Sequence, residues 1–419
     1  MHKRQWSGVN DVSHKVIKDI RDCVKLMKDE YNVLIVHNKY QLAGGEDTVA
    51  ENEGKLLSAY GNHVFYYIRD NAEIRDYGLL KKIKLGIATF FSIKSFHEIS
   101  EIIVKNKIDI VHVHNTVPLI SCAAYFAAKK YGCALVQSIH NMRMLCPTGM
   151  MIKEDAICEE CVGMGLRCAV KNKCYHNSAI QSAILAGSIA FHRLIGSYKK
   201  VDAYLVTTEF NRKMLEKVVD KTKIYMKPYY SDSKTLSPDN KERGYYIYIS
   251  RLEHLKGIHV ALQAFRKLPN QKLIVLGIGP DEEKSHKYVK DNNMTNVEFL
   301  GFKSKSDMVT LLYNAKALIF PTQWYEGFPM TIVESLAVGT PIIGSNIGNV
   351  GTIIQDGISG LTFQYDDPED LISKIEYFEN NPAEAMKMEQ GAQKYFIDNH
   401  TPENIYKCTM RIYEDCLSE

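Results

Sequence analysis

The sequence predicts an α/β protein with two lobes, each built on a parallel sheet that helices cover on both faces. Short apolar runs alternate with helix-compatible segments along most of the 419 residues, which is the pattern of consecutive βα units. The pattern occurs in two series, separated at residues 233–244 by a polar stretch with Pro and Gly that we interpret as a linker. Two lobes joined by a short linker form a cleft, which is a common place for a ligand.

The first lobe is expected to span residues 31–232. Its first strand is followed by a loop that contains Gly44 and Gly45, and then by a helix. Residues 1–30 are charged and carry apolar residues at helical spacing, so we expect an appended helix before this lobe. The strands expected in the lobe are Asn32–His37, Val64–Ile68, Ile108–His114, Ala134–His140 and Val201–Thr207.

The second lobe is expected to span residues 245–399, followed by a C-terminal helix at residues 400–419. The turn around Gly277 and Gly279 is similar to a dinucleotide-binding fingerprint but lacks its third glycine, so we interpret it as an ordinary turn at a strand end. The strands expected in this lobe are Tyr245–Ser250, Lys272–Leu276, Val297–Leu300, Ala317–Phe320 and Pro341–Gly344.

The composition is that of a globular protein, with 45% hydrophobic and 24% charged residues. No apolar run approaches the roughly 20 residues of a membrane span, and the N-terminus lacks the apolar core of a signal peptide, so we expect a cytoplasmic protein. Residues 1–240 carry 34 Lys and Arg against 25 Asp and Glu, whereas residues 241–419 carry 18 against 24. A basic first half suits an anionic acceptor or a membrane surface, although an ordinary solvated face explains the same excess.

Two carboxylates lie close to the start of one helix in the second lobe. Glu326 follows an apolar strand, and Glu334 lies on the next helix, whose first turn Pro329 suits. Backbone N–H groups at a helix start attract an anion, and carboxylates accept hydrogen bonds from sugar hydroxyls. The segment therefore fits a phosphate-rich sugar donor, while the alternative is a capped surface helix with two solvated acids.

Arg251 and Lys256 follow the first strand of the second lobe. The carboxyl ends of parallel strands are where α/β sheets bind their ligands. Arg supplies a planar fork of donors and Lys a mobile ammonium, so together they can neutralise the charge on a departing diphosphate. Taken alone, the pair is more often part of an exposed turn.

Together these motifs resemble the retaining glycosyltransferases of family 4, which have the GT-B architecture of two Rossmann-like lobes around a ligand cleft. The resemblance covers about residues 31–419, and it also includes the turn Asp356–Leu361. It implies that a sugar moves from a UDP- or GDP-sugar to a glycan or lipid-linked acceptor with retention at the anomeric carbon. No catalytic metal and no nucleic-acid partner are expected, and peripheral contact with the inner face of a membrane is compatible with this function.

The resemblance also implies roles for individual residues. The acceptor would attack on the same face of the sugar that the diphosphate leaves, assisted by a donor phosphate oxygen. The residues concerned are Arg251 and Lys256 at the diphosphate, Glu326 at a donor-sugar hydroxyl, Glu334 at the ribose, Phe302 near the base, Gly327, Phe328, Pro329, Met330 and Thr331 along the donor, Gly44 and Gly45 near the phosphates, and His140 as an active-site histidine.

A cysteine-rich insertion at residues 146–174 follows His140. It contains one CxxC pair, and four thiolates can bind zinc tetrahedrally. A structural zinc, free thiols and redox bonding all remain open, because a single CxxC does not fix the geometry. The insertion is similar to one found in some family-4 relatives, in which the matching positions are Cys146, Cys158, Cys161 and Cys174.

Two other functions are compatible with isolated features. The Gly277/Gly279 turn alone suggests a nicotinamide-dependent oxidoreductase. The cysteine cluster with its neighbouring basic residues alone suggests a noncatalytic, zinc-stabilised nucleic-acid-binding protein, but this leaves the whole second lobe unexplained. The apolar segment Ser182–Phe191 either touches a lipid acceptor or forms a buried helix.

Overall fold

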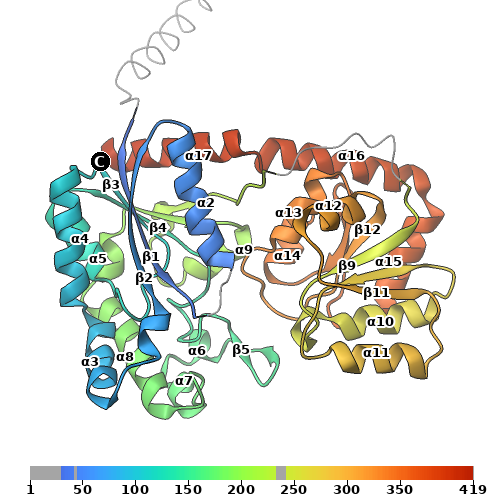
Figure 1. The fold of residues 1–419 in the computed structure, drawn as a ribbon, viewed down its shortest axis with the longest axis horizontal. Coiled ribbons are helices and arrows are strands. Elements are labelled where there is room, and N and C mark those ends of the chain that lie inside the picture. Colours follow the sequence, from blue (N-terminus) through green and yellow to red (C-terminus); the bar gives the residue numbers. More distant parts are fainter. Residues whose placement is uncertain (1–29, 42–44, 233–241, 419) are drawn as a thin grey trace, which may run out of the picture.

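The computed structural model describes residues 30–41, 45–232 and 242–418, which form two α/β lobes side by side (Figure 1). The expected helix at residues 1–30, apart from Glu30, lies outside the described residues, as do Gly44 and most of the expected linker. None of the helices in the described part of the chain is long and apolar enough to cross a bilayer.

The sheet of the first lobe has six parallel strands in the order β2-β1-β3-β4-β7-β8. A two-stranded antiparallel hairpin, β5-β6, lies apart from it in the cysteine-rich insertion. The strands are β1 (Asn32–Lys39), β2 (His63–Asp70), β3 (Ile110–Val113), β4 (Ala134–Ser138), β5 (Ile152–Lys153), β6 (Ala156–Ile157), β7 (Ala203–Val206) and β8 (Ile224–Met226).

Hydroxyl side chains begin several helices of this lobe by accepting a hydrogen bond from a first-turn N–H group, as Ser92 does for α4, Ser178 for α8 and Thr208 for α9. The helices are α2 (Gly45–Ala59), η1 (Asn71–Ile74), α3 (Leu79–Phe90), α4 (Ile93–Asn106), α5 (Ala123–Lys130), α6 (Glu160–Gly163), α7 (Arg167–Lys171), α8 (Ala179–Leu194), η2 (Ser197–Lys200), α9 (Glu209–Leu215) and η3 (Lys221–Lys223).

The sheet of the second lobe also has six parallel strands, in the order β11-β10-β9-β12-β13-β14. Its strands are β9 (Tyr245–Ile249), β10 (Leu273–Leu276), β11 (Val297–Gly301), β12 (Ala315–Phe320), β13 (Ile342–Ser345) and β14 (Gly360–Phe363). Its helices are η5 (His254–Lys256), α10 (Ile258–Lys267), α11 (Glu282–Asp291), α12 (Lys305–Tyr313), α13 (Met330–Ala337), α14 (Gly348–Ile353), α15 (Pro368–Asn380) and α16 (Pro382–Asn399).

The C-terminal helix α17 (Pro402–Ser418) returns to the first lobe. Figure 1 shows α16 and α17 as one red band that runs along both lobes. Ile412 and Tyr413 of α17 are buried in an apolar cluster with Val33 and Leu205 of the first sheet. The last helix therefore ties the two lobes together.

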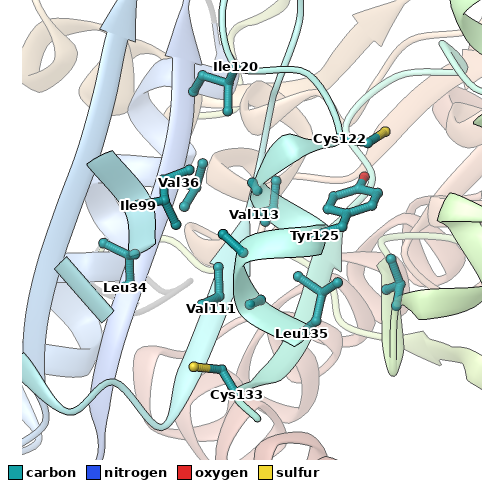
Figure 2. Close-up of a cluster of buried hydrophobic side chains, with 14 of the residues drawn as sticks. Leu34, Val36, Ile99, Val111, Val113, Ile120, Cys122, Tyr125, Cys133 and Leu135 are labelled. Atoms are coloured by element: carbon teal, nitrogen blue, oxygen red, sulfur yellow. The ribbon is translucent and has the colours of Figure 1, made fainter. Parts of the chain in front are cut away.

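Each sheet is buried on both faces, as parallel sheets usually are. On one face of the first sheet, Leu34 and Val36 pack with Ile99 of α4 and with Tyr125 of α5 (Figure 2). The alternate residue Val33 packs on the other face, in the cluster that includes α17. Because side chains alternate across a strand, β1 contributes to both cores.

The expected strands and their order along the chain are confirmed, with differences at their ends and four omissions. The omitted strands are β5, β6, β8 and β14, whose runs of two to four residues are too short for a clear periodic signal. β4 ends at Ser138, so His140 lies in the loop beyond the strand. Pro329 is the residue before α13 and not part of its first turn.

Candidate active site

The order of strands explains why Lys256 and Glu326 meet. In the second sheet the chain moves outward from β9 to one side through β10 and β11, and to the other side from β12 onward. The loops after β9 and β12 therefore leave adjacent strands at the point where the order reverses, which is where open α/β sheets bind ligands. η5 carries Lys256 in the first of these loops, and Glu326 lies in the second.

Lys256 and Glu326 form an ion pair in which both carboxylate oxygens accept from one ammonium. Lys256 Nζ lies 2.8 Å from Glu326 Oε1 and 2.8 Å from Oε2. The Thr322 hydroxyl donates to Oε1 at 2.9 Å, and Lys256 Nζ also lies 4.8 Å from the centre of the Trp324 ring. Glu326 is buried, so this set of partners is what holds its charge in place.

Glycines allow the loops around this pair to approach one another. A Cβ atom at Gly257, where φ is 69°, would lie 1.7 Å from the carbonyl oxygen of Pro321 in the loop after β12. Cβ atoms at Gly277 and Gly279 would lie 1.9 Å from the Ser250 carbonyl oxygen and 2.3 Å from that of Leu252. The glycines after β10 therefore support the loop after β9, a packing role for the motif that we interpreted as a strand-end turn.

Arg251 lies in the same loop but in a different environment. Its side chain is 64% exposed, and its Nε lies 3.6 Å from a carboxylate oxygen of Glu253. Among the described residues, the ion pair with Glu326 thus involves Lys256 and not Arg251. Phe302, just beyond β11, is also largely exposed.

Asn349 holds the segment after Glu326 in position. Its side-chain amide donates to the carbonyl oxygens of Glu326 and Gly327, and its own oxygen accepts from the Thr208 hydroxyl of the first lobe. Asn349 is not predictable from the sequence, because a single Asn carries no pattern. The available signal was its position after β13, at the same edge of the sheet as Glu326.

Glu334 lies on α13 and is almost completely buried. Burial raises the pKa of its carboxyl above the ordinary value, and Lys305 partly opposes this change. Lys305 Nζ lies 4.0 Å from Glu334 Oε1 and also pairs with Asp232, which precedes the expected linker. A buried carboxylate with one distant cation has acceptor capacity left for a ligand.

In the first lobe, His140 lies at the end of a row of histidines. Its Nε2 is 2.9 Å from His114 Nδ1, and its Nδ1 bonds to the Tyr229 hydroxyl. Burial lowers the pKa of His140 to about 3, and the charges of His37 and Lys227 add to the effect. Burial raises the pKa of Tyr229 well above its usual range, so a protonated Tyr229 hydroxyl and a neutral His140 share this hydrogen bond.

Residues from both lobes line one cavity with a volume of about 1570 Å³. His140 and Gly327 meet across it, since a Cβ atom on Gly327 would lie 3.0 Å from the His140 carbonyl oxygen. Gly45, at the start of α2, lines the first-lobe side with Glu46 and Asn141. The residues of the second lobe that line the other side are Trp324, Tyr325, Glu326, Gly327, Phe328, Met330 and Asn349.

A polar network missed from the sequence lies on the first-lobe wall. Glu46 accepts from Asn141 Nδ2 at 2.7 Å and from the Tyr40 hydroxyl at 2.9 Å. These residues follow β1 and β4, whose carboxyl ends lie at the same edge of the first sheet. Glu46 therefore brings a second carboxylate to the cavity, opposite Glu326.

The cysteine-rich insertion contacts the loop after β12, which carries Glu326. The Tyr325 hydroxyl donates to Glu159 Oε1 at 2.9 Å, and Glu159 lies between Cys158 and Cys161. Burial raises the pKa of the Cys161 thiol to about 12, with Cys146 as the next cause. In the described ranges, no group of three or more His, Cys, Asp or Glu side chains is arranged to hold a metal ion.

Comparison with known proteins supports the architecture that these lobes define. Residues 232–395 match the family model described as "Glycosyl transferases group 1". A structure of HepE from Anabaena in complex with UDP and glucose superposes with a TM-score of 0.62, covering 93% of this chain and 100% of that one at 15% identity. Two Rossmann-like sheets in this arrangement are the GT-B fold, so the expected fold class is confirmed.

Two curated relatives show how far the sequence similarity extends. Glycogen synthase of Mycobacterium tuberculosis is 26% identical over 177 residues, which are 40% of this chain and 41% of that protein. The N-acetyl-alpha-D-glucosaminyl L-malate synthase of Bacillus anthracis is 22% identical over 396 residues, which are 91% of this chain and 96% of that protein. The glycogen synthase match thus spans about two fifths of that relative's length, while the second match includes both lobes.

Proposed function

We propose that the protein is a retaining glycosyltransferase that moves a sugar from a UDP- or GDP-sugar to a glycan or lipid-linked acceptor. The observation that carries this proposal is Glu326 at the switch point of the second sheet, which pairs with Lys256 and lines the same cavity as His140. It is supported by the family match of residues 232–395, and by UDP and glucose in the Anabaena structure.

In the proposed reaction, the bond between the anomeric carbon and the diphosphate breaks, and a bond to the acceptor oxygen forms on the same face. The acceptor hydroxyl proton passes to an oxygen of the departing diphosphate. Lys256 stabilises the charge that develops on this leaving group, and a fixed cation in a partly buried site is effective at that task. We assign Arg251 as a second cation, since its exposed side chain is free to turn toward a bound diphosphate.

We assign the remaining residues by the same chemistry. Glu326 accepts from a donor-sugar hydroxyl once the diphosphate draws Lys256 away, and Glu334 accepts from the ribose hydroxyls, because a buried carboxylate needs hydrogen-bond donors. His140 acts as a neutral positioning group and not as an acid or base, because burial keeps its pKa near 3. The assigned neighbours of the donor are Gly44, Gly45, Phe302, Gly327, Phe328, Pro329, Met330 and Thr331.

We further propose a structural zinc bound by Cys146, Cys158, Cys161 and Cys174. No three of these cysteines are arranged in the structure to hold a metal ion, so zinc would have to draw the four thiols of this short insertion together into a closed tetrahedral site. Such an ion would cross-link the insertion and would leave no open position for a substrate. Through Glu159 and Tyr325, the insertion would then hold the segment that carries Glu326.

A screen of nucleotide sugars tests the proposed activity. We expect one UDP- or GDP-sugar to raise the melting temperature and to be slowly hydrolysed without an acceptor. NAD and NADP serve as controls, because the Gly277/Gly279 turn suggests an oxidoreductase as the alternative. Stabilisation by a nicotinamide cofactor, with no response to any nucleotide sugar, would replace the proposed function.

A further inference from the structure

The helix α3 presents an apolar surface to solvent. Leu79, Leu80, Ile83 and Ile87 have exposed fractions of 76%, 76%, 54% and 67%. Leu79, Ile83 and Ile87 are spaced four residues apart, so they form a stripe along one face of the helix. A contiguous exposed apolar stripe of this kind marks an interaction surface and not a random scatter of hydrophobic residues.

The helix α8 extends this surface because it packs directly against α3. Gly86 lies where a Cβ atom would be 3.3 Å from Ile184, and the Ser188 hydroxyl donates to the Thr89 carbonyl oxygen at 2.9 Å. Ile180, in the first turn of α8, is 74% exposed. The segment Ser182–Phe191, which was expected either to touch a lipid or to be buried, is divided: one side of α8, including Leu185 and Ile189, is buried, whereas Phe191 is 39% exposed.

Basic residues predominate along the helices of this surface. Residues 77–97 contain four lysines, Lys81, Lys82, Lys84 and Lys94, and no Asp or Glu, and Lys94 pairs with Glu98 just beyond this stretch at 3.8 Å. Residues 162–201, which include α7 and α8, contain six Lys and Arg and again no Asp or Glu. Basic residues beside exposed apolar residues on a helix are the composition of a surface that lies on an anionic bilayer.

The surface is continuous with the candidate active site. Lys82, Ile83, Ile87 and Ile180 line the same cavity that contains His140 and Glu326. We propose that the α3/α8 surface, defined by Leu79, Leu80, Ile83, Ile87 and Ile180, docks on an anionic lipid bilayer. The open side of the cavity then faces the membrane. A lipid-linked acceptor enters there, and this last step rests on the glycosyltransferase function proposed above.

A second copy of this chain fits less well. In a two-fold symmetric dimer the same patch would face itself, so the lysines of one α3 would lie near those of the other. An anionic bilayer satisfies both the apolar stripe and the lysines.

Co-sedimentation with vesicles tests the docking without any substrate. We expect the full chain to bind vesicles of phosphatidylcholine with phosphatidylglycerol, to bind phosphatidylcholine alone much less, and to lose binding as salt is raised. Lys81→Ala with Lys84→Ala should weaken binding roughly thirtyfold, since each lysine near an anionic surface contributes roughly fivefold. Ile83→Glu should abolish binding.

The matched control is Lys387→Ala with Lys394→Ala, which removes two exposed lysines from α16 in the other lobe. If both double variants lose vesicle binding equally, net charge alone explains the effect, and the proposal is overturned. A dimer that Ile83→Glu dissociates would also overturn the proposal. The same holds if α3 is already protected from carbene labelling before vesicles are added. Vesicle binding without sugar transfer would support the docking and overturn the proposed function. Sugar transfer to a soluble acceptor without vesicle binding would support the proposed function and overturn the docking.

Discussion

Lys256 Nζ lies at the same distance, 2.8 Å, from both carboxylate oxygens of Glu326, so each residue neutralises the other in the structure without a donor. The cation assigned to the diphosphate and the carboxylate assigned to the donor sugar are therefore coupled. A bound diphosphate competes with Glu326 for Lys256, which leaves Glu326 acceptor capacity for a sugar hydroxyl. Their loops leave adjacent strands, so the coupling is a consequence of the strand order.

Glu326 and Glu334 should respond differently to the same substitution. We expect Glu326→Gln to lower kcat with little loss of donor affinity, because it removes a repulsive charge near the diphosphate together with a sugar contact. Glu334→Gln should weaken donor binding, because the ribose loses a charged acceptor. Titration calorimetry and steady-state kinetics measure the two effects. Unchanged affinity and turnover in both variants would leave only a structural role.

Glu334→Gln should also raise the melting temperature at neutral pH. The pKa of Glu334 is raised in the folded protein, so the stability that its neutral form gives at low pH is lost as the pH rises from the ordinary carboxyl pKa through the raised one. A glutamine side chain does not ionise, so the variant does not lose this stability as the pH rises. We expect the difference between variant and wild type to be largest near pH 7 and to vanish below the ordinary carboxyl pKa. A constant difference across this range would argue against burial as the cause.

His140 should leave no titration step in the activity near pH 6.5. Burial holds its pKa near 3, so it stays neutral across the range in which an ordinary histidine titrates. Because this pKa is depressed, its contribution to stability is present above pH 6.5 and declines as the pH falls toward 3. We expect His140→Gln to reduce this decline, measured by urea unfolding at several pH values. A His140-dependent step in kcat near pH 6.5 would show that the histidine acts as an acid or base.

The Thr208–Asn349 hydrogen bond should link the two lobes to donor binding. Asn349→Ala leaves the carbonyl oxygens of Glu326 and Gly327 without their hydrogen-bond donor, and an unsatisfied buried polar group costs about 1–3 kcal/mol. We expect a higher KM for the donor and a lower melting temperature. Asn399→Ala is the control, because that side chain bonds to a helix carbonyl away from the cavity. Equal effects of the two variants on KM would contradict the role of Asn349.

The cysteine insertion should hold about one zinc ion per chain when the protein is prepared under reducing conditions. Cys158→Ser should lose the metal and lower the melting temperature, whereas Cys168→Ser should keep the metal because Cys168 is outside the proposed set. Metal analysis of the wild type and the two variants measures the zinc content of each. Protein without metal, whose stability and activity survive replacement of all four cysteines by serine, would exclude both a structural zinc and an essential redox centre.

The long, regular elements were predictable, and the contacts between loops were not. β1 and β9 are apolar runs that predict strands. The positions of Glu326 and Lys256 after strands of the second lobe predict a ligand site. The sequence could not indicate that Lys256 alone, and not Arg251, meets Glu326, because that depends on side-chain direction within one loop. Asn349 and Glu46 were missed for a similar reason, since each acts through tertiary contacts that no local pattern encodes.

The affinity of a nucleoside diphosphate for the wild type and for Lys256→Ala tests the central assignment most directly. Lys316→Ala is a matched control, because Lys316 also pairs with a glutamate, Glu379, at 2.7 Å and lies over a ring, that of Tyr246, but away from the cavity. We expect UDP or GDP to bind the wild type and Lys316→Ala equally, while Lys256→Ala loses affinity and, with the cognate donor, about 10²–10³-fold in kcat. Equal binding and near-normal turnover in Lys256→Ala would contradict the account.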